Sequence, residues 1–465
     1  GRVELGLNEA FLPPRRGSAM VPSGAPDQGS IRVTYIGYLS AQLGLGEAAR
    51  GNIRALRSQG IQVDTVDVSH FTSSERQAWT GGDVETPEVV SDEVQQVVIL
   101  HVNADQLAEI RRELSPGLLD QAYVIGMWAW ETSRFPRHWW PSFSMLNEVW
   151  VGGSYMAEGI SAVSPIPVLR IPHVVEAPSV SADRSAFDLP DDEFIFLFMF
   201  DFHSTPARKN PDGAIRAFRR AFRPSERVRL VVKSMNGHNR PEAFAQLKES
   251  AGDARITFMD AALPDDARYK LLASADAFLS LHRAEGFGLG IAEAMALGKP
   301  VIATGWSGNM DFMNVANSLP VRYQLAELAQ ADPPYAAGTV WAEPDIGHAA
   351  DLMRQLFEQP DRAAQIGTRA RSDVQQLLSV GRVGQLMTER LERISEIRCM
   401  GIGRLLDASV SVMPDPVTAP VQRSPLRVVL HGARLSLFAV MPRRYQPAYH
   451  RVATTIARRM GYLRR

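Results

Sequence analysis

The sequence has only one cysteine, Cys399, among its 465 residues. A single cysteine excludes a disulfide within the chain and a metal site built from several thiolates. It fits a reducing, cytoplasmic setting. The sequence also shows no apolar run long enough to span a bilayer, and no leader in which charged residues precede an apolar stretch. Nothing in it therefore predicts a transmembrane helix.

An excess of charge of either sign is also lacking, because the formal net charge is -1. The overall charge therefore gives no reason to expect nucleic acid as a partner. The composition, 45% hydrophobic and 22% charged, is typical of a globular protein that buries substantial cores. A chain of this length fits two domains with extensions better than one core.

Two series of short β-rich runs alternating with helical segments occupy most of the chain. The first begins at residue 31 with "IRVTYIGYL", followed by "GLGEAARGNIRALRSQG", in which apolar residues recur at helical spacing. The second begins with "FIFLFMF" at residues 194–200, after the polar stretch 176–193. Continuous apolar strands between helices predict parallel sheets covered on both faces. The predicted fold is α/β, with two Rossmann-like, doubly wound domains that face a cleft.

These patterns divide the chain into four predicted regions. Residues 1–30 are rich in Pro, Gly and Ser, and we expect a flexible arm there. Residues 31–185 form the first domain and residues 186–398 the second. Residues 399–465 form a basic C-terminal extension.

The stretch "LHRAEGFGLGIAEAMALGKPVIAT", residues 281–304, carries the most specific motif. Glu285 follows a predicted strand and precedes a glycine-rich turn, and Glu293 lies about one turn into the next predicted helix. The glycines let a ligand approach the backbone closely, and the helix N-terminus attracts an anion. Anion donors beside two carboxylates suit a ligand with phosphate at one end and hydroxyls elsewhere, such as a nucleotide sugar.

Two other ligand chemistries compete for the same residues. Glycoside hydrolases also use two carboxyl groups, but a hydrolase pair leaves the tandem Rossmann pattern and the nearby basic residues unexplained. "GLGEAAR" is not the dinucleotide fingerprint in its usual position, which disfavours an NAD enzyme.

The Glu285-x7-Glu293 block resembles the signature of retaining glycosyltransferases of the GT-B fold, particularly glycosyltransferase family 4. The resemblance extends over most of residues 31–380 and includes "GYLSAQLGLGEAAR" and "RKNPDGAIRAF". It implies a hexosyltransferase that moves a hexose from a nucleotide diphosphate sugar to a glycan or lipid-linked acceptor, as in bacterial envelope polysaccharide synthesis. Alternatives are a sugar phosphorylase or epimerase of the same fold, or a non-catalytic nucleotide-sugar binding subunit.

The resemblance also implies roles for individual residues. Glu285 would contact hydroxyls of the donor sugar, and Glu293 would accept hydrogen bonds from the ribose. Lys209 would neutralise the diphosphate, and His101 would lie near the transferred sugar. Further donor contacts are implied for Arg208, Lys233, Gly44 and Gly46 at the diphosphate, and for the backbone of Gly286, Phe287, Gly288 and Leu289.

One departure from the family pattern concerns the phosphate site. Many relatives end the first strand of the second domain with Gly-Arg, whereas this chain reads "MFDFHS", with Asp201 near that place. The sequence has no Asp-x-Asp pair that would hold a divalent ion on a diphosphate. Because lysine, arginine and a helix N-terminus can supply the same charge, we expect neither a metal nor any other cofactor.

Aromatic residues are concentrated in one segment of the first domain. Five of the eight tryptophans, at positions 128, 130, 139, 140 and 150, lie in or beside "MWAWETSRFPRHWWPSFSMLNEVW". Most of them are expected in the core, although a stacking platform for an acceptor sugar is an alternative. Glu131, Arg134 and Arg137 in this segment are weaker candidates for an acceptor site.

The C-terminal extension differs in charge from the rest of the chain. Residues 399–465 contain eleven arginines but only two acidic residues, Asp407 and Asp415. Apolar residues recur at helical spacing over 445–465, which fits a basic amphipathic helix at an anionic membrane surface. A helix that braces the body of the protein is the alternative. A membrane role would place the enzyme on the inner face of the cytoplasmic membrane.

Overall fold

The protein is described by a computed structural model that covers residues 31–79, 81, 96–114, 117–119 and 122–399. The predicted N-terminal arm, residues 1–30, lies outside the described residues. So does the basic extension from residue 400 onward, with the amphipathic helix predicted for 445–465.

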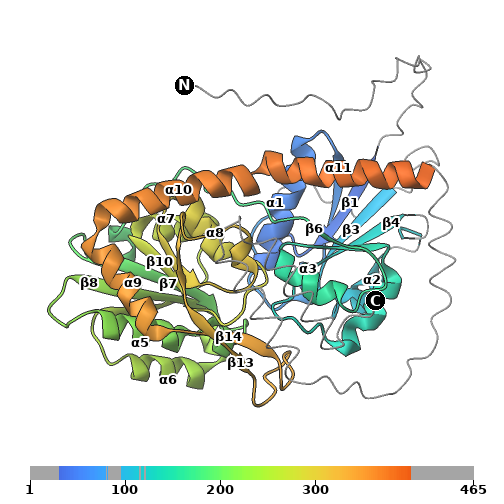
Figure 1. The fold of residues 1–465 in the computed structure, drawn as a ribbon. Coiled ribbons are helices and arrows are strands. Elements are labelled where there is room, and N and C mark those ends of the chain that lie inside the picture. Colours follow the sequence, from blue (N-terminus) through green and yellow to red (C-terminus); the bar gives the residue numbers. More distant parts are fainter. Residues whose placement is uncertain (1–30, 80, 82–95, 115–116, 120–121, 400–465) are drawn as a thin grey trace, which may run out of the picture. The chain divides into compact units, whose positions relative to one another are not determined.

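The first domain, in which Figure 1 labels β1, β3, β4 and β6, contains a sheet of six strands. All of its strands are parallel, and their order is β2-β1-β3-β4-β5-β6. Its strands are β1 (Arg32–Gly37), β2 (Gln62–Asp67), β3 (Gln96–His101), β4 (Tyr123–Trp128), β5 (Glu148–Val151) and β6 (Val168–Arg170). Its α-helices are α1 (Gly44–Ser58), α2 (Leu107–Glu113) and α3 (Ser154–Ser161).

The second domain repeats this architecture with the strand order β12-β11-β10-β7-β8-β9, again all parallel. Its strands are β7 (Phe194–Asp201), β8 (Val228–Met235), β9 (Ile256–Asp260), β10 (Ala277–Ser280), β11 (Val301–Thr304) and β12 (Leu319–Val321). An antiparallel hairpin adds β13 (Tyr323–Glu327) and β14 (Val340–Pro344). The helices are α4 (Pro206–Lys209), α5 (Pro211–Ala221), α6 (Pro241–Ala251), α7 (Asp265–Ser274), α8 (Leu289–Ala296) and α9 (Ile346–Glu358). The two parallel sheets confirm the predicted α/β fold.

Local sequence explains how the central strands and helices form. β7, "FIFLFMFD", is apolar along almost its whole length, as expected for a strand buried on both faces of a parallel sheet. Asn210 adopts a left-handed conformation between α4 and α5, and its Oδ1 accepts a hydrogen bond from the Gly213 backbone N–H. Pro211 then opens α5, where its missing N–H costs nothing.

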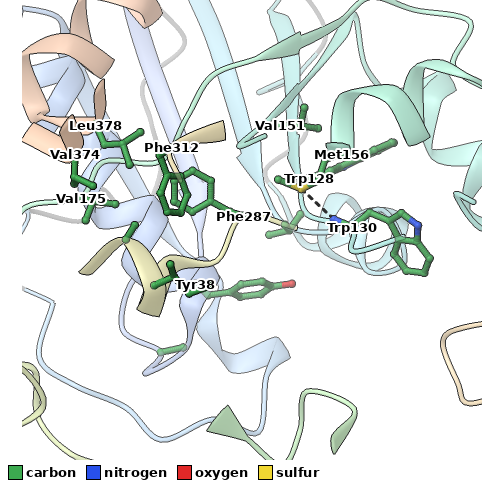
Figure 2. Close-up of a cluster of buried hydrophobic side chains, with 14 of the residues drawn as sticks. Tyr38, Trp128, Trp130, Val151, Met156, Val175, Phe287, Phe312, Val374 and Leu378 are labelled. Carbon is green, nitrogen blue, oxygen red and sulfur yellow. Dashed lines mark hydrogen bonds between the residues drawn. The ribbon is translucent and has the colours of Figure 1, made fainter. Parts of the chain in front are cut away.

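The buried aromatic segment joins the two domains. One continuous apolar cluster contains Trp128, Trp130 and Met156 from the first domain together with Phe287 and Phe312 from the second (Figure 2). Trp128 and Trp130 are almost fully buried, and so is Trp150 in a neighbouring cluster. The expectation that most of the grouped tryptophans belong to the core is confirmed, and Trp140 is the exposed exception.

The last two helices belong to different cores. α10 (Pro360–Leu378) packs on α8 in the second domain, whereas α11 (Val380–Cys399) packs on α1 in the first (Figure 1). α11 lies very close to α1, since a Cβ on Gly384 would lie 2.5 Å from the Ala55 carbonyl oxygen. The apolar face of α11 completes the first-domain core with Val383, Met387, Leu391 and Ile394. The sequence boundary at 398 assigned this helix to the second domain, but its packing partners lie in the first.

None of the helices in the described part of the chain is both long and apolar enough to cross a membrane.

A buried ion pair fixes α11 to the first sheet and yields a test of stability. Glu148 of β5 is fully buried, accepts hydrogen bonds from Tyr123 Oη and Trp150 Nε1, and pairs with Arg390 of α11. Arg390→Ala leaves this carboxylate without its cation, so the free energy of unfolding should fall by about 3 kcal/mol or more. Urea unfolding followed by tryptophan fluorescence measures the loss.

Arg393 on the same helix is the matched control, because it is exposed and its ion pair, with Glu396, is also at the surface. Arg393→Ala should change the free energy of unfolding by less than about 1 kcal/mol. Equal effects of the two substitutions would show that α11 is not held by the Glu148 pair.

Candidate active site

Residues from both domains line a cavity of about 460 Å³ at the carboxyl ends of their strands. This is where ligands bind in open α/β sheets. Of the twelve residues that the sequence proposed for the site, all except Gly46 and His101 line this cavity. These ten are Gly44, Arg208, Lys209, Lys233, Glu285, Gly286, Phe287, Gly288, Leu289 and Glu293.

Glu285 lies at the centre of a cluster of charges. Lys209 Nζ is 2.5 Å from its Oε1, and Arg208 Nη1 is 3.4 Å from its Oε2. Burial alone would raise the pKa of Glu285, but Lys209 and Arg208 outweigh burial and lower the pKa to about 2. The carboxylate is therefore ionised at every physiological pH, which suits a hydrogen-bond acceptor for hydroxyls and not a proton donor.

The turn after Glu285 is shaped by close contacts with the first domain and within the second. A Cβ on Gly286 would lie 3.0 Å from the Trp130 carbonyl oxygen, and one on Gly308 would lie 1.7 Å from the Gly286 carbonyl oxygen. Gly288 has φ of +90°, which a residue with a side chain adopts only with strain. Glycine is therefore required here by the packing of the protein itself as well as by access for a ligand.

Backbone donors at the start of α8 face the same cavity. α8 begins at Leu289, and its N-cap residue, Gly288, has no side chain that could cap the first N–H groups. The first N–H groups of a helix have no partner within the helix, and they favour an anion. Phe287 contributes its backbone to this region, while its side chain is buried against His173 and Phe312.

Glu293 is held by two residues that the sequence did not single out. Arg268 Nη1 lies 2.6 Å from Glu293 Oε2, and Tyr269 Oη donates to Oε1 at 3.3 Å. Both partners lie on α7, and Arg268 also lines the cavity. The sequence gives no local signal for the contacts of Arg268 and Tyr269 with Glu293, because α7 and α8 come together only in the folded protein.

Lys233 is the cavity lysine best placed to meet a ligand. It extends from β8, is only 4% exposed, and its ammonium has no hydrogen bond or ion pair to any residue in the described ranges. Burial and the nearby Arg268 lower the pKa of Lys233 to about 8, although Asp201 opposes this change. A ligand anion would supply the missing partner for this buried cation.

His101 and Gly46 lie behind the cavity wall. His101 is fully buried, with Nδ1 2.7 Å from Tyr35 Oη, and its ring stacks on His173 with centroids 5.9 Å apart. His173 is the histidine that lines the cavity, and burial lowers its pKa to about 4, so its ring is neutral at physiological pH. Gly46 lets α1 pack closely, because a Cβ there would lie 2.6 Å from the Tyr38 carbonyl oxygen.

Asp201 occupies the cavity wall where the family pattern would place an arginine. Its Oδ1 accepts hydrogen bonds from Asn236 Nδ2 at 2.8 Å and from the His203 backbone N–H at 2.9 Å. Of the acceptor candidates from the sequence, Glu131 lines the cavity, while Arg134 and Arg137 do not.

Two Rossmann-like domains around a shared cavity are the architecture of the GT-B glycosyltransferases. Residues 180–373 match the family model described as "Glycosyl transferases group 1". This match confirms the resemblance to glycosyltransferases carried by the Glu285–Glu293 block. A comparison with curated protein sequences gives no match.

Solved structures support the same fold. Sucrose-phosphate synthase from Thermosynechococcus elongatus has a TM-score of 0.56 at 15% identity, covering 78% of this chain and 98% of that one. HepE from Anabaena, solved in complex with UDP-glucose, has a TM-score of 0.56 at 13% identity, covering 78% and 99%. A glycosyltransferase from Rickettsia africae has a TM-score of 0.53 at 15% identity, covering 78% and 98%.

Lys233 gives the site a testable pH dependence. Its ammonium is charged below a pH of about 8 and loses its charge as the pH rises through that value. If it binds the donor anion, kcat/KM for the donor should fall above that pH, because this ratio reports groups of the free enzyme. Lys233→Arg keeps the charge, so its profile should stay level to about pH 10. Initial rates measured from below pH 8 to about pH 10 test this expectation. If kcat/KM of Lys233→Arg fell above pH 8 as it does in the parent, the titrating group would be another residue.

Proposed function

We propose that this protein transfers a hexose from a nucleotide diphosphate sugar to a glycan or lipid-linked acceptor, with retention of configuration at the sugar carbon. The observation that carries the proposal is the pairing of Glu285 with Lys209 and Arg208 beside the uncapped start of α8. These groups place a hydroxyl acceptor next to cations and N–H donors. A sugar joined to a diphosphate needs an acceptor for its hydroxyls and positive groups for its phosphates.

The chemistry follows from where charge develops. The bond between the sugar carbon and the diphosphate oxygen breaks, which leaves negative charge on the diphosphate and an oxocarbenium-like sugar. Arg208, Lys209, Lys233 and the α8 N–H groups stabilise the departing diphosphate. The acceptor oxygen bonds to the sugar carbon on the face that the diphosphate leaves, and the acceptor proton passes to the diphosphate.

The two glutamates bind different parts of the donor in this proposal. Glu285, permanently ionised, accepts hydrogen bonds from hydroxyls of the transferred hexose. Glu293, fixed by Arg268 and Tyr269, accepts them from the ribose. The UDP-glucose complex of HepE, which shares the fold, supports a donor of this class.

The acceptor and the cellular location belong to the same proposal. A lipid-linked acceptor would require a cytoplasmic enzyme that binds the inner face of the membrane as a peripheral protein. The eleven arginines of residues 399–465 support this, because a basic segment is attracted to anionic lipid. Synthesis of bacterial envelope polysaccharide is a process that needs such an enzyme.

A panel of labelled nucleotide sugars, with and without candidate acceptors, tests the function directly. Transfer of label to an acceptor supports a transferase, and the anomeric form of the product, read by NMR, tests retention. Tight binding of a nucleotide sugar without turnover would instead support a non-catalytic binding subunit. Phosphorolysis of a glycan would support a phosphorylase, and interconversion of free donor sugars an epimerase.

Glu285→Ala and Lys209→Ala test the catalytic assignment. Each removes part of the charge arrangement around the breaking bond, so kcat should fall by about a hundredfold or more. Circular dichroism should show an intact fold. Asp212→Ala and Arg216→Ala are controls, because these residues form an exposed pair on α5 outside the cavity. Turnover at the parent rate by either cavity variant would refute its assignment.

Chelation tests the proposal that transfer needs no metal ion. Because Arg208, Lys209, Lys233 and the start of α8 can neutralise the diphosphate, activity should persist in excess EDTA. The measurement is the initial rate before and after chelation. Loss of activity that Mg²⁺ or Mn²⁺ restores would overturn this part of the proposal.

A further inference from the structure

The loop between β13 and β14, residues 328–339, extends from the second domain to the first. Its own backbone bonds brace it, since Leu328 N donates to Thr339 O at 2.9 Å and Gly338 N donates to Leu328 O at 2.8 Å. Asp332 and Tyr335 also exchange backbone hydrogen bonds at 2.9 and 2.8 Å. The loop therefore presents Tyr335 in a fixed conformation.

Tyr335 is buried although it lies on a loop. Only 4% of it is exposed, and its ring packs on Trp130 of the first domain with centroids 5.5 Å apart. Its Oη donates a hydrogen bond of 2.9 Å to Glu131 Oε2. Trp130 belongs to the apolar cluster shared by the two domains (Figure 2).

Glu131 in turn reaches the catalytic charges. Its Oε1 lies 3.6 Å from Nη2 of Arg208, whose Nη1 lies 3.4 Å from Glu285 Oε2. Arg208 is only 3% exposed, and its Nη1 also donates to the Ala284 carbonyl oxygen at 2.8 Å. Burial alone would lower the pKa of Arg208, but Glu131 and Glu285 outweigh it, and the pKa is raised. The guanidinium is thus held between one carboxylate from each domain.

The base of the same hairpin is bonded to the chain next to Glu285. Ala342 N of β14 donates to Arg283 O at 2.9 Å, and Arg283 N donates to Arg208 O at 2.7 Å. Arg283 Nε also pairs with Glu343 Oε2 at 2.5 Å. One rigid hairpin therefore contacts the catalytic turn at its base and Glu131 at its tip.

We propose that Glu131 is a positioning residue for Arg208, and that Tyr335 holds Glu131 in place for this purpose. We call this set of contacts, Tyr335–Glu131–Arg208, the clasp. Glu131 completes the donor site from the first domain, because it fixes the arm of the guanidinium that Glu285 does not contact. The inference rests on the proposed transfer reaction, which gives Arg208 its catalytic task.

The competing explanation is that Glu131 binds an acceptor hydroxyl directly. Both of its oxygens, however, already face partners in the protein, Tyr335 on one side and Arg208 on the other. A carboxylate so occupied orients its partners more readily than it captures a new ligand. Loss of a positioning residue should lower kcat, whereas loss of an acceptor contact should raise the KM for the acceptor.

Glu131→Gln and Tyr335→Phe test the clasp. Glu131→Gln keeps the shape but removes the charge, so kcat should fall about tenfold or more, with KM for donor and acceptor changed less than about threefold. Tyr335→Phe keeps the ring on Trp130 and should lower kcat by a smaller factor. The double variant should be no slower than Glu131→Gln alone, because the tyrosine acts only through the glutamate.

Two matched controls keep the comparison specific. Glu226→Gln alters a carboxylate that pairs with Arg354 away from the cavity, and Tyr323→Phe removes a hydroxyl from the same hairpin. Both should retain parent rates. An unchanged kcat in Glu131→Gln would overturn the positioning role. If the losses in kcat of the two single variants multiplied in the double variant, the clasp would be overturned. If Glu131→Gln raised only the KM for the acceptor, direct acceptor binding would be favoured.

Hydrogen exchange tests the clasp without a substrate. Amides of residues 328–339 should exchange faster in Tyr335→Phe and Glu131→Gln than in the parent, while those of β7 keep their protection. This readout remains valid even if no nucleotide sugar is turned over, so failure of the proposed function and failure of the clasp can be told apart. Unchanged exchange in both variants would show that the contact does not hold the loop.

Discussion

The ion cluster of Glu285 with Lys209 and Arg208 is the interaction on which the rest of the site depends. A buried carboxylate is stable only when cations and hydrogen bonds offset its lost hydration. The cations stand at the end of α4, and the carboxylate stands after β10, 76 residues later. The parallel order of β7 and β10 brings these strand ends side by side. The cluster therefore depends on the pairing of β7 with β10.

How much of this could be predicted depended on the range of the contacts. Glu285, the glycine turn and Glu293 lie within nine residues, so strand, turn and helix signals placed both carboxylates correctly at the cavity. The pairs Arg268–Glu293 and Tyr335–Glu131 join residues 25 and 204 positions apart. No periodicity links such residues, because their meeting depends on how helices and domains pack.

The two candidates that do not line the cavity, His101 and Gly46, show the same limit at shorter range. The sequence showed that His101 ends a strand, but not that this end is covered by His173, which faces the cavity instead. Likewise the sequence assigned residues 380–398 to the second domain without showing that the apolar face of α11 joins the core of the first. Whether a side chain is buried depends on the elements that pack beside it, and these cannot be identified from a single sequence.

Charge balance in the cavity explains how one set of residues can serve both stability and binding. Within the protein, Lys209 and Arg208 pair with Glu285, and Arg268 pairs with Glu293. A diphosphate competes for these cations, so its affinity is a difference between two sets of ion pairs and not the sum of the new ones. A phosphate that drew Lys209 or Arg268 toward itself would leave oxygens of Glu285 and Glu293 available for hydroxyl donors, while Arg208 would stay beside Glu131. A ligand that carries both phosphate and hydroxyls would therefore offer partners to the cations and to the carboxylates, whereas phosphate alone would leave buried carboxylates short of partners.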